Sequence, residues 1–302
     1  MINKEVLVSI VTPVYNQAGT LRETIESVLG QTYPNIEYII VNDGSTDDTE
    51  AIIKEYESVL KVIRQENQGQ AAALNTGWCN AKGRYLAYLS ADDILYSNCI
   101  DELVKSIDDK YVVYYPDFDL IDAHSKIIRT IESPEYSQHA LLGDLVCQPG
   151  LAALFCADAY RKAGGWDSKY RFIPDYEFWA RMSCQGPFQR VKKVLGGFRV
   201  HENSGSVKSV SEVHSDEIIC FVASFDGFGS SEDRNKAKFQ AYLMSARSHF
   251  QSKRFKIGVK RFYLAFKENP SRSIEWANVK FVLNGALRRA FYRAVLTFSR
   301  RK

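Results

Sequence analysis

The sequence predicts an α/β fold, a mostly parallel sheet flanked by helices, followed by a helical C-terminal region. Short β-branched runs alternate with helical patterns of about 10 to 15 residues, an order typical of βαβ units. A polar motif follows each of four such runs: TPVYN, NDGSTDD, ENQGQ and SADD. Ligands of such sheets bind beyond the carboxyl ends of the strands, so we expect these motifs to share one binding edge.

The segment between residues 6 and 90 carries the clearest alternation. The run VLVSIVTPVY predicts a buried strand that stops at a proline, and TLRETIESVLGQT predicts a helix with Thr20 as N-cap. IEYIIV predicts a second strand, and TDDTEAIIKEY predicts a helix whose acidic first turn suits the helix dipole. The strand KVIRQ, the helix GQAAALNTGWCNA and the strand RYLAYLS complete this part.

The pattern is less regular from Tyr111 to Arg199. We expect strands over YVVYYPDFDLID and KIIRTI, a short helix over LLGDLV, and a helix over CADAYRKAGGW that ends at its glycines. PDYEFWARMSCQG predicts a helix with Pro174 near its start, and VKKVLGGFRVHENSGS predicts a strand entering a polar loop. Helical patterns dominate afterwards, so we expect one domain over residues 1–210 and a helical region over 211–302.

Composition excludes several classes of protein. A chain of 302 residues with 45% hydrophobic and 25% charged residues is neither disordered nor fibrous. The six cysteines lack metal-ligand spacing, so we expect reduced, mostly buried thiols and a cytoplasmic location. The N-terminal apolar run is too short for a signal peptide, and no segment approaches the ~18 apolar residues of a membrane span.

Asp92 and Asp93 place two carboxylates side by side at the end of a strand. One interpretation is a helix N-cap and first-turn acid, since DILYSNCIDELVKSI can begin a helix. The other is a divalent cation, because carboxylate oxygens suit Mg²⁺ or Mn²⁺, and these ions keep positions open for substrate phosphates. The residues alone leave both interpretations open.

Asp43 and Gly44 form a second candidate at a strand end. Asp-Gly is also an ordinary turn signal. At a sheet edge, however, Asp43 could accept a hydrogen bond from a base N–H, and Gly44 could allow backbone to approach a ligand. The chain has no GxxxxGK[ST] and no GxGxxG after the first strand, which weighs against a P-loop enzyme and a dinucleotide-dependent oxidoreductase.

In combination and in order, these motifs resemble the family 2 glycosyltransferases, which have the GT-A fold. The resemblance rests on VSIVTPVYNQAGTLRETIESVLGQTYPNIEYIIVNDGSTDDT, NQGQAAALNTG and YLSADD, and it extends from residue 5 to about 205. It implies an inverting transferase that moves a hexosyl or N-acetylhexosaminyl group from a nucleotide-sugar. The implied acceptor is a hydroxyl of a glycan or lipid-linked molecule in polysaccharide or glycolipid biosynthesis.

The resemblance also assigns roles to individual residues. Tyr15 would stack on the nucleobase, and Asp43 would accept from uracil N3–H, which favours UDP-sugars. The residues that would bind the nucleotide-sugar are Thr12, Pro13, Tyr15, Asp43, Gly44, Asn67, Gly69, Asn75, Ala91 and Asp92.

SADD matches the family's DxD motif, which implies that Asp92 binds a divalent cation, Mn²⁺ or Mg²⁺, that bridges the diphosphate. Asp93 is a further candidate ligand. Ser90 replaces the first aspartate of the motif, which puts ribose contacts in doubt. His201 would complete the metal or diphosphate site, although a lone loop histidine is more commonly a surface or core residue. Arg199 would meet phosphate or face solvent.

GGWDSKYRFIPDYEFWARM resembles the family's glycine loop and its x-E-D segment, with Asp175 at the catalytic position and Pro174 where Glu is common. A carboxylate beside the acceptor hydroxyl would take its proton as general base. Glu177 is the alternative base, and a first-turn acid stabilised by the helix dipole is the alternative role of Asp175. One base and no evident opposing nucleophile predict a single displacement with inversion.

The C-terminal segment from Trp276 to Lys302 contains no acidic residue. A basic amphipathic helix there could lie on an anionic membrane, at the inner face of the cytoplasmic membrane. The alternative is a helix packed on the protein with a solvated basic tail.

No nucleic-acid recognition motif is present, and the QxxRW motif of processive relatives is missing, which favours single-sugar transfer. Ser90 and Pro174 also suggest a rival, a catalytically impaired sugar-nucleotide-binding or scaffold protein. The apolar residues of the predicted basic amphipathic helix at the C-terminus are Phe281, Leu283, Leu287, Phe291, Val295 and Phe298.

Overall fold

A computed structural model describes residues 6–200 and 211–283 of the chain. The chain divides into two compact units. The first comprises Met1–Tyr136, Gln148–Ser168 and Arg181–Arg199, and the second comprises Ser137–Cys147, Lys169–Ala180 and Val200–Lys302. Two segments from before residue 200 therefore group with the C-terminal helices, rather than with the domain over 1–210 expected from the sequence.

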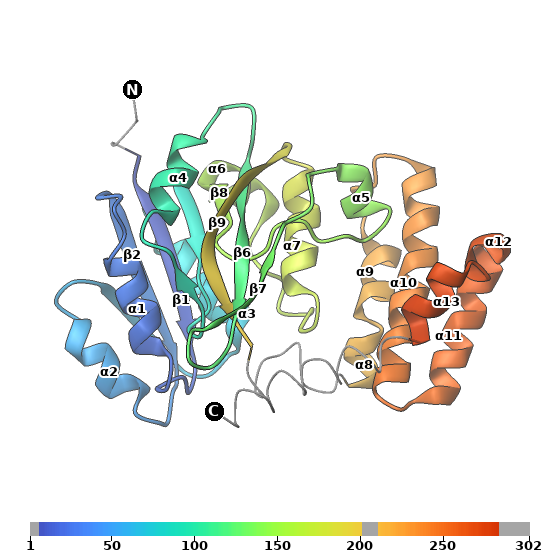
Figure 1. Cartoon of the computed structure of the whole chain (residues 1–302), viewed down its shortest axis with the longest axis horizontal. Helices are drawn as coiled ribbons and strands as arrows, with labels where there is room; N and C mark the ends of the chain where they lie inside the picture. The colour runs from blue at the N-terminus through green and yellow to red at the C-terminus, as the bar shows by residue number, and fades with distance from the viewer. Residues whose placement is uncertain (1–5, 201–210, 284–302) are drawn as a thin grey trace. The chain divides into compact units, whose positions relative to one another are not determined.

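One sheet forms the first unit, with strand order β3-β2-β1-β4-β8-β6-β9-β5 and β7 paired to β6 (Figure 1). The four strands of its first half are parallel, as predicted. They are β3 (Lys61–Gln65), β2 (Ile36–Asp43), β1 (Val8–Val14) and β4 (Tyr85–Tyr88). Every residue of β1 is buried, which explains why five of its seven residues are apolar and why its two polar residues, Ser9 and Thr12, are inside the protein.

The second half of the sheet is mixed. Among its strands only the β6–β9 pair is parallel, and β8, β5 and β7 all pair antiparallel. The strands are β8 (Leu154–Cys156), β6 (Val113–Ile121), β9 (Phe188–Arg199), β5 (Ile94–Leu95) and β7 (Ile127–Ile131). Sequence analysis missed β8 and β5, because runs of three and two residues are too short to show a period.

Helices connect the strands of the first unit. The predicted helices α1 (Leu21–Leu29), α2 (Thr49–Tyr56) and α3 (Gln70–Cys79) follow β1, β2 and β3 in turn. Farther along the chain, α6 (Ala157–Ala163) ends at Gly164 as predicted. Another helix, α4 (Cys99–Lys105), begins six residues after Asp93, and the strand β5 lies between them. The interpretation of Asp92 and Asp93 as a helix N-cap and first turn is therefore wrong.

The second unit is helical. Its segment 137–147 contains α5 (Gln138–Leu142), which starts three residues earlier than predicted because Ser137 Oγ accepts a hydrogen bond from Ala140 N–H. The helix α7 (Pro174–Ser183) starts at the predicted proline. The remaining helices are α8 (Glu212–Ser215), α9 (Glu217–Ser224), α10 (Ser231–Gln251), α11 (Phe255–Glu268), α12 (Pro270–Ser273) and α13 (Trp276–Leu283).

Each unit has its own apolar core. The sheet strands and α1 bury residues such as Ile10, Ile25 and Ile40, and each fully buried side chain of this size contributes roughly 1.5–3 kcal/mol. In the second unit Phe239, Leu243, Ala246, Ala265 and Val282 pack together, with Phe281 beside them. Phe281 was predicted to belong to the apolar face of a helix on the membrane. For Phe281 that prediction is wrong, because its side chain packs against the core of the second unit.

The side chain of Leu283 is not described, and the other apolar residues of the predicted membrane helix, from Leu287 to Phe298, lie outside the described residues. Within residues 6–200 and 211–283, none of the helices combines the length and the apolar character that crossing a bilayer requires.

All six cysteines are free thiols. The expectation that most are buried is wrong, since Cys79, Cys184 and Cys220 are exposed. Cys79 is the last residue of α3 and Cys184 directly follows α7, so both lie where the packed face of a helix stops.

Candidate functional site

The carboxyl ends of four parallel strands meet at one edge of the sheet. Val14 of β1 lies beside Asn42 of β2, Asp43 lies beside Gln65 of β3, and β4 runs parallel to β1 on its other side. The four polar motifs span the ends of these strands and the loops that follow them, so they lie at one edge of the sheet as expected from the sequence.

Asp43 organises the loop between β3 and α3. Its Oδ1 accepts hydrogen bonds from Gln65 Nε2 (2.7 Å) and Gln68 N–H (2.9 Å), and its Oδ2 accepts one from Gly69 N–H (2.8 Å). The residue is buried at the end of β2. A carboxylate oxygen has two lone pairs, so Oδ2 keeps acceptor capacity for a ligand N–H. Asp43 and Gly69 are thus brought together. Asn67, two residues before Gly69 in the same loop, is exposed.

Gly44 lies close to the backbone of another loop of the protein. It has φ +72°, and a Cβ built on it would lie 2.9 Å from the backbone nitrogen of Asn67. The positive φ and the lack of space both require glycine. The neighbour is the β3–α3 loop, so Gly44 has a role in loop packing. The expected approach of its backbone to a ligand stays a prediction.

The loops after β1 and β2 are cross-linked through Asn16. Its side-chain Oδ1 accepts from Thr46 N–H (2.7 Å), and its own N–H donates to Ser45 Oγ (3.1 Å). Gln17 N–H donates to Thr49 Oγ1 (3.0 Å). These bonds leave Tyr15 at the start of the loop with 46% of its surface exposed, which suits an aromatic platform.

Thr12 and Pro13 are buried within β1, unlike Tyr15. Thr12 Oγ1 lies 3.0 Å from the phenol oxygen of Tyr38, so its hydroxyl has a partner inside the core. Because this hydroxyl already has a partner in the core, the structure does not favour a nucleobase contact by the Thr12 side chain. Nucleotide binding by Thr12 and Pro13 stays a prediction.

The turn after β4 is anchored to α1. Thr20 takes the predicted N-cap position, yet its hydroxyl donates to the carbonyl of Ala91 (2.9 Å) rather than capping the helix. Asp93 N–H closes the turn on the carbonyl of Ser90 (3.1 Å). Ala91 is buried. Asp92 is half-buried whereas Asp93 is buried, so the carboxylate predicted to bind the cation is the more accessible of the two aspartates.

Asp93 has a structural partner. It is 3% exposed, and its Oδ1 accepts from the backbone N–H of Arg199 (2.8 Å) in β9. Burial raises the pKa of the Asp93 carboxyl well above its ordinary value, and the negative charge of Asp92 raises it further. Asp93 therefore ties the β4 turn to β9, and the structure does not favour it as a metal ligand.

Arg199 is buried beneath the same turn. Its guanidinium donates to the carbonyls of Asp92 (2.7 Å) and Asp122 (3.0 Å), to Ser125 Oγ (3.0 Å) and to Glu23 Oε2 (2.6 Å). The solvent-facing alternative is wrong, and four protein acceptors make phosphate binding by Arg199 unfavourable. Its effect is to hold the backbone of Asp92 in place.

The donor chemistry of the turn fits a divalent cation in part. Asp92 offers a hard carboxylate oxygen, and Mg²⁺ is commonly bound by one or two carboxylates together with substrate phosphates. His201, the second predicted ligand, lies outside the described residues. Among those that are described, no three His, Cys, Asp or Glu side chains form a metal-binding group.

Asn75 and Arg181 hold the glycine loop 163–166 from two sides. Asn75 Nδ2 donates to the carbonyl of Trp166 (2.8 Å) and Oδ1 accepts from its N–H (2.9 Å). Gly165 has no room for a side chain, because a Cβ would lie 2.1 Å from Asn75 Oδ1. Asn75 thus gives one donor and one acceptor to the loop backbone, and the second N–H and the second lone pair of its amide remain for other partners. That Asn75 also lines the nucleotide pocket stays a prediction.

Arg181 was not identified from the sequence. Its guanidinium donates to the carbonyls of Ala163, Gly164 (2.9 Å) and Gly165 (2.6 Å). An arginine in a helix that follows a Gly-Gly turn is the only sequence signal, and it does not specify these partners.

Asp175 lies in the first turn of α7, in the second unit. It is half-buried, and burial raises the pKa of its carboxyl. Tyr176 fixes the start of the helix by donating from its phenol to the carbonyl of Leu141 (2.6 Å). Burial, followed by the charge of Asp175, raises the pKa of Cys147, so this thiol lies near the carboxylate. The alternative base Glu177 is 5% exposed.

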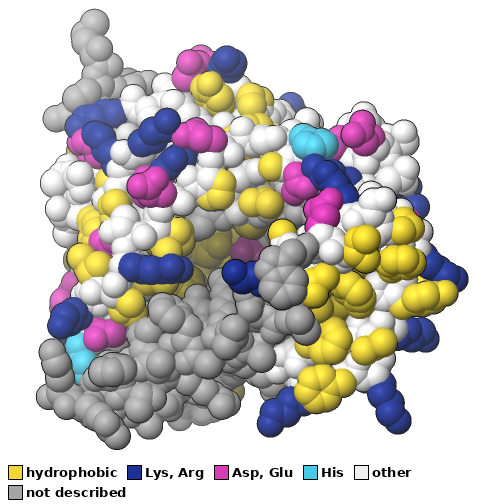
Figure 2. All heavy atoms as spheres, turned by 45° about the vertical axis from the view of Figure 1, so that its right-hand side comes forward, with side chains coloured by type: hydrophobic (Ala, Val, Ile, Leu, Met, Phe, Trp, Pro, Cys, Tyr) yellow, Lys and Arg dark blue, Asp and Glu magenta, His cyan; other side chains and the backbone are white. Residues whose placement is uncertain are grey.

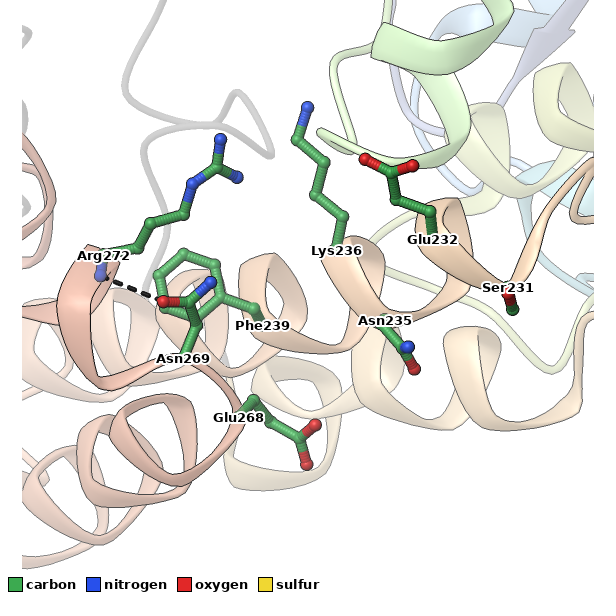
Figure 3. A pocket seen from close by; sticks show the side chains of 8 residues that line it. All are labelled: Ser231, Glu232, Asn235, Lys236, Phe239, Glu268, Asn269 and Arg272. Carbon is green, nitrogen blue, oxygen red and sulfur yellow. Dashed lines mark hydrogen bonds between the residues drawn. The ribbon is translucent and has the colours of Figure 1, made fainter.

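The second unit also contains a pocket of about 450 Å³. In Figure 3, Glu232 and Lys236 extend side by side from α10, and Arg272 lies toward the other end of the pocket. Lys236 donates to Asp144 (2.8 Å) within this unit. None of the predicted site residues lines this pocket.

Comparison with known proteins places the chain among sugar transferases. Residues 9–163, just over half of the chain, match the family described as Glycosyl transferase family 2. An uncharacterised glycosyltransferase of Rickettsia prowazekii is 36% identical over 206 residues, which are 65% of this chain and 64% of that protein. The chain thus spans less than two thirds of that relative's length.

Two solved structures share the architecture. Residues 1–349 of S. aureus TarS, solved in complex with UDP-GlcNAc, align with a TM-score of 0.68 at 15% identity, over 95% of this chain and 92% of that 1–349 chain. The mannosyltransferase PcManGT of Pyrobaculum calidifontis, in complex with GDP-Man and Mn²⁺, aligns with a TM-score of 0.62 at 15% identity, over 98% and 85% of the two chains. The fold expected from the sequence is confirmed.

Proposed function

The chain belongs to glycosyl transferase family 2, and we propose that it transfers one sugar from a nucleotide-sugar to an acceptor hydroxyl with inversion. The donor we favour is a UDP-sugar carrying a hexosyl or N-acetylhexosaminyl group. The acceptor we propose is a glycan or lipid-linked molecule in polysaccharide or glycolipid biosynthesis. TarS, which shares the fold, was solved with UDP-GlcNAc, and that supports a UDP donor.

The observation that carries this proposal is the assembly at the edge of the parallel strands. Tyr15 follows β1, Asp43 ends β2 and Asp92 follows β4, so three side chains suited to base stacking, base hydrogen bonding and cation binding occupy one edge. Asp43 uses three hydrogen bonds to shape the loop that would surround the nucleoside.

Asp92 and His201 would hold Mn²⁺ or Mg²⁺ together with the diphosphate of the donor. When bound, the cation would neutralise negative charge on the leaving diphosphate. The chain's own contribution there is positional. Arg199 and Thr20 bond the carbonyls of Asp92 and Ala91, so the carboxylate is presented from a rigid turn.

Asp175 is the base we propose for the acceptor hydroxyl. A proton would pass from that hydroxyl to a carboxylate oxygen of Asp175 as the new glycosidic bond forms. Its raised pKa favours this role, because a stronger base accepts a proton more readily near neutral pH. Glu177 is the alternative base, and its 5% exposure makes it the weaker candidate.

We also propose that the enzyme works in the cytoplasm, at the inner face of the cytoplasmic membrane, where lipid-linked acceptors would be reached. The residues of the basic tail after Leu283 would contribute to that attachment. A catalytically impaired binding or scaffold protein is the rival, and it rests on Ser90 and Pro174 in place of common acidic residues.

Release of UDP decides between transferase and scaffold. We expect the wild-type chain to release UDP from a UDP-sugar with Mn²⁺, and Asp175→Asn to lower kcat about 10²- to 10⁴-fold, the usual contribution of a general base. UDP with Mn²⁺ should still raise the melting temperature of this variant. Screening UDP-, GDP- and dTDP-sugars in the same thermal assay identifies the nucleotide.

Asp158→Asn is the matched control, because Asp158 is exposed and forms a surface ion pair with the exposed Arg161. It should keep wild-type turnover. For the wild type, kcat/KM should fall as pH decreases through the raised pKa of Asp175, at a pH above the ordinary ~3.9 of Asp. Wild-type nucleotide binding without any UDP release would support the scaffold instead.

A further inference from the structure

The helix α11 has one face fixed inside the second unit. Ala265 is fully buried, and Phe262 packs on the core around Phe239. Arg261 donates to the carboxylate of Asp216, with 3.1 Å between Nε and Oδ1. These contacts set the rotation of the helix, so they also determine which side chains face outward.

The outward face of α11 carries a row of large apolar side chains. Phe255, Val259, Tyr263 and Phe266 are 59%, 59%, 54% and 39% exposed. They are spaced four, four and three residues apart, so they line one side of the helix. Figure 2 shows hydrophobic side chains gathered on this part of the surface, with Lys and Arg around them. Contiguous exposed apolar surface of this kind marks an interaction site.

A row of lysines runs directly beside the apolar row. Lys256, Lys260 and Lys267 are exposed, and each follows an apolar member of the first row by one position. No ion pair joins these lysines to a carboxylate within the described parts of the chain. Lys267 Nζ lies 5.2 Å from the centre of the Tyr263 ring, so the two rows are in contact.

We propose that the outward face of α11 lies on an anionic lipid surface. A helix parallel to a bilayer buries aromatic and aliphatic side chains at the level of the headgroups, and lysines at its edge attract anionic lipids. The charge of the surface selects this occupant. The tail 284–302 has no acidic residue to meet the lysines, and a second copy would bring the same lysine row.

This contact is separate from the one expected of the basic tail and does not depend on the donor or the reaction. It would use a folded, packed helix as the membrane-facing element. Each lysine close to an anionic leaflet strengthens binding by roughly fivefold, so three of them give a strong dependence on anionic lipid.

Flotation of the full-length chain with vesicles tests the proposal. We expect the chain to float with vesicles of equimolar phosphatidylcholine and phosphatidylserine, and much less with phosphatidylcholine alone. The variants Val259→Glu/Tyr263→Glu and Lys256→Glu/Lys260→Glu should each lower the bound fraction at least about tenfold, and high salt should weaken wild-type binding. Circular dichroism verifies folding, and the lysine variant, which changes only exposed side chains, tests the surface even if the apolar variant fails to fold.

Lys82→Glu/Lys162→Glu is the matched control for Lys256→Glu/Lys260→Glu. Both variants change the net charge by the same amount, but the control does so at exposed lysines of the first unit. It should bind within about twofold of the wild type. UDP release should be unchanged in all three variants, so a failure here is distinct from a failure of the proposed transferase. The proposal is overturned if the α11 variants float like the wild type, or if the wild type binds no vesicles. It is equally overturned if the wild type is a dimer that Val259→Glu/Tyr263→Glu separates into monomers.

Discussion

Asp92 and Asp93 are neighbours in the chain but have different surroundings. Asp93 is buried against the backbone of Arg199, whereas Asp92 is half-buried at the binding edge. The second carboxylate of the SADD motif thus has a role in the fold that is independent of any ligand. This distinction predicts that the two positions respond differently to the same substitution.

Asp93→Asn should keep the bond from Arg199 N–H, because an amide oxygen accepts as a carboxylate does. The pKa of Asp93 is raised in the folded state, so the folded protein holds its proton more tightly than the unfolded chain. The wild type therefore loses unfolding free energy as pH rises from about 3.9 toward the folded-state pKa. The variant should lack that loss.

Urea unfolding of both proteins across this pH range measures the effect. The stability of Asp93→Asn relative to the wild type should increase with pH, with Mn²⁺-dependent UDP binding retained. Asp92→Asn is the comparison, and it should keep the fold but weaken that binding. A constant difference in stability at every pH would contradict the role given to Asp93.

At the scale of elements, the loops after β2 and β3 depend on each other. Gly44 packs against the backbone of Asn67, and Asp43 bonds the backbone of Gln68 and Gly69. The end of one strand thus shapes the loop after the next one. Any ligand held at this edge would meet the two loops as a single rigid surface.

Gly44→Ala should lower the free energy of unfolding by about 1–3 kcal/mol, because the new Cβ adds a positive-φ penalty and a backbone clash. UDP affinity should fall with it. Gly19→Ala is the matched control, since no atom beyond its two chain neighbours lies within 4 Å of a Cβ at that position. Urea unfolding and UDP titration of both variants check this, and equal effects of the two substitutions would be evidence against the coupled loops.

At the scale of the whole molecule, each unit has an internal polar junction. In the second unit Asp216 connects α8 and α9 to Ser245 and His249 of α10 and to Arg261 of α11. His249 Nδ1 accepts from Arg254 Nε (2.9 Å), so its ring proton lies on Nε2 and donates to Asp216. These hydrogen bonds lower the pKa of Asp216, although burial opposes them.

Asp216→Asn should lower the unfolding free energy of the protein by about 2 kcal/mol at neutral pH, because hydrogen bonds to a charged group are lost. The carboxylate's lowered folded-state pKa stabilises the fold above the unfolded pKa, and this stabilisation disappears as pH falls through the folded-state value. The difference between variant and wild type should therefore shrink in acid. Chemical unfolding at several pH values measures it, and a difference that grows in acid would refute the assignment.

The sequence by itself determined the order and type of most elements. The strands β1 to β4 and the helices α1 to α3 follow from periodicity and from turn residues, which act over a few neighbouring positions. The same local signals located the motifs at strand ends and carried the family assignment. Short strands such as β5 and β8 could not be predicted from the sequence, because their strand geometry comes from pairing with β9, β4 and β6.

Only the tertiary structure decided what individual side chains do. Thr12 bonds Tyr38, Asn75 bonds Trp166, and Arg199 bonds the carbonyl of Asp92, each across more than twenty residues of sequence. A hydrogen bond is set by the position and direction of its partner, and a local pattern specifies neither. Residue type and spacing were therefore enough to find the binding edge, whereas the partners within it required the folded chain.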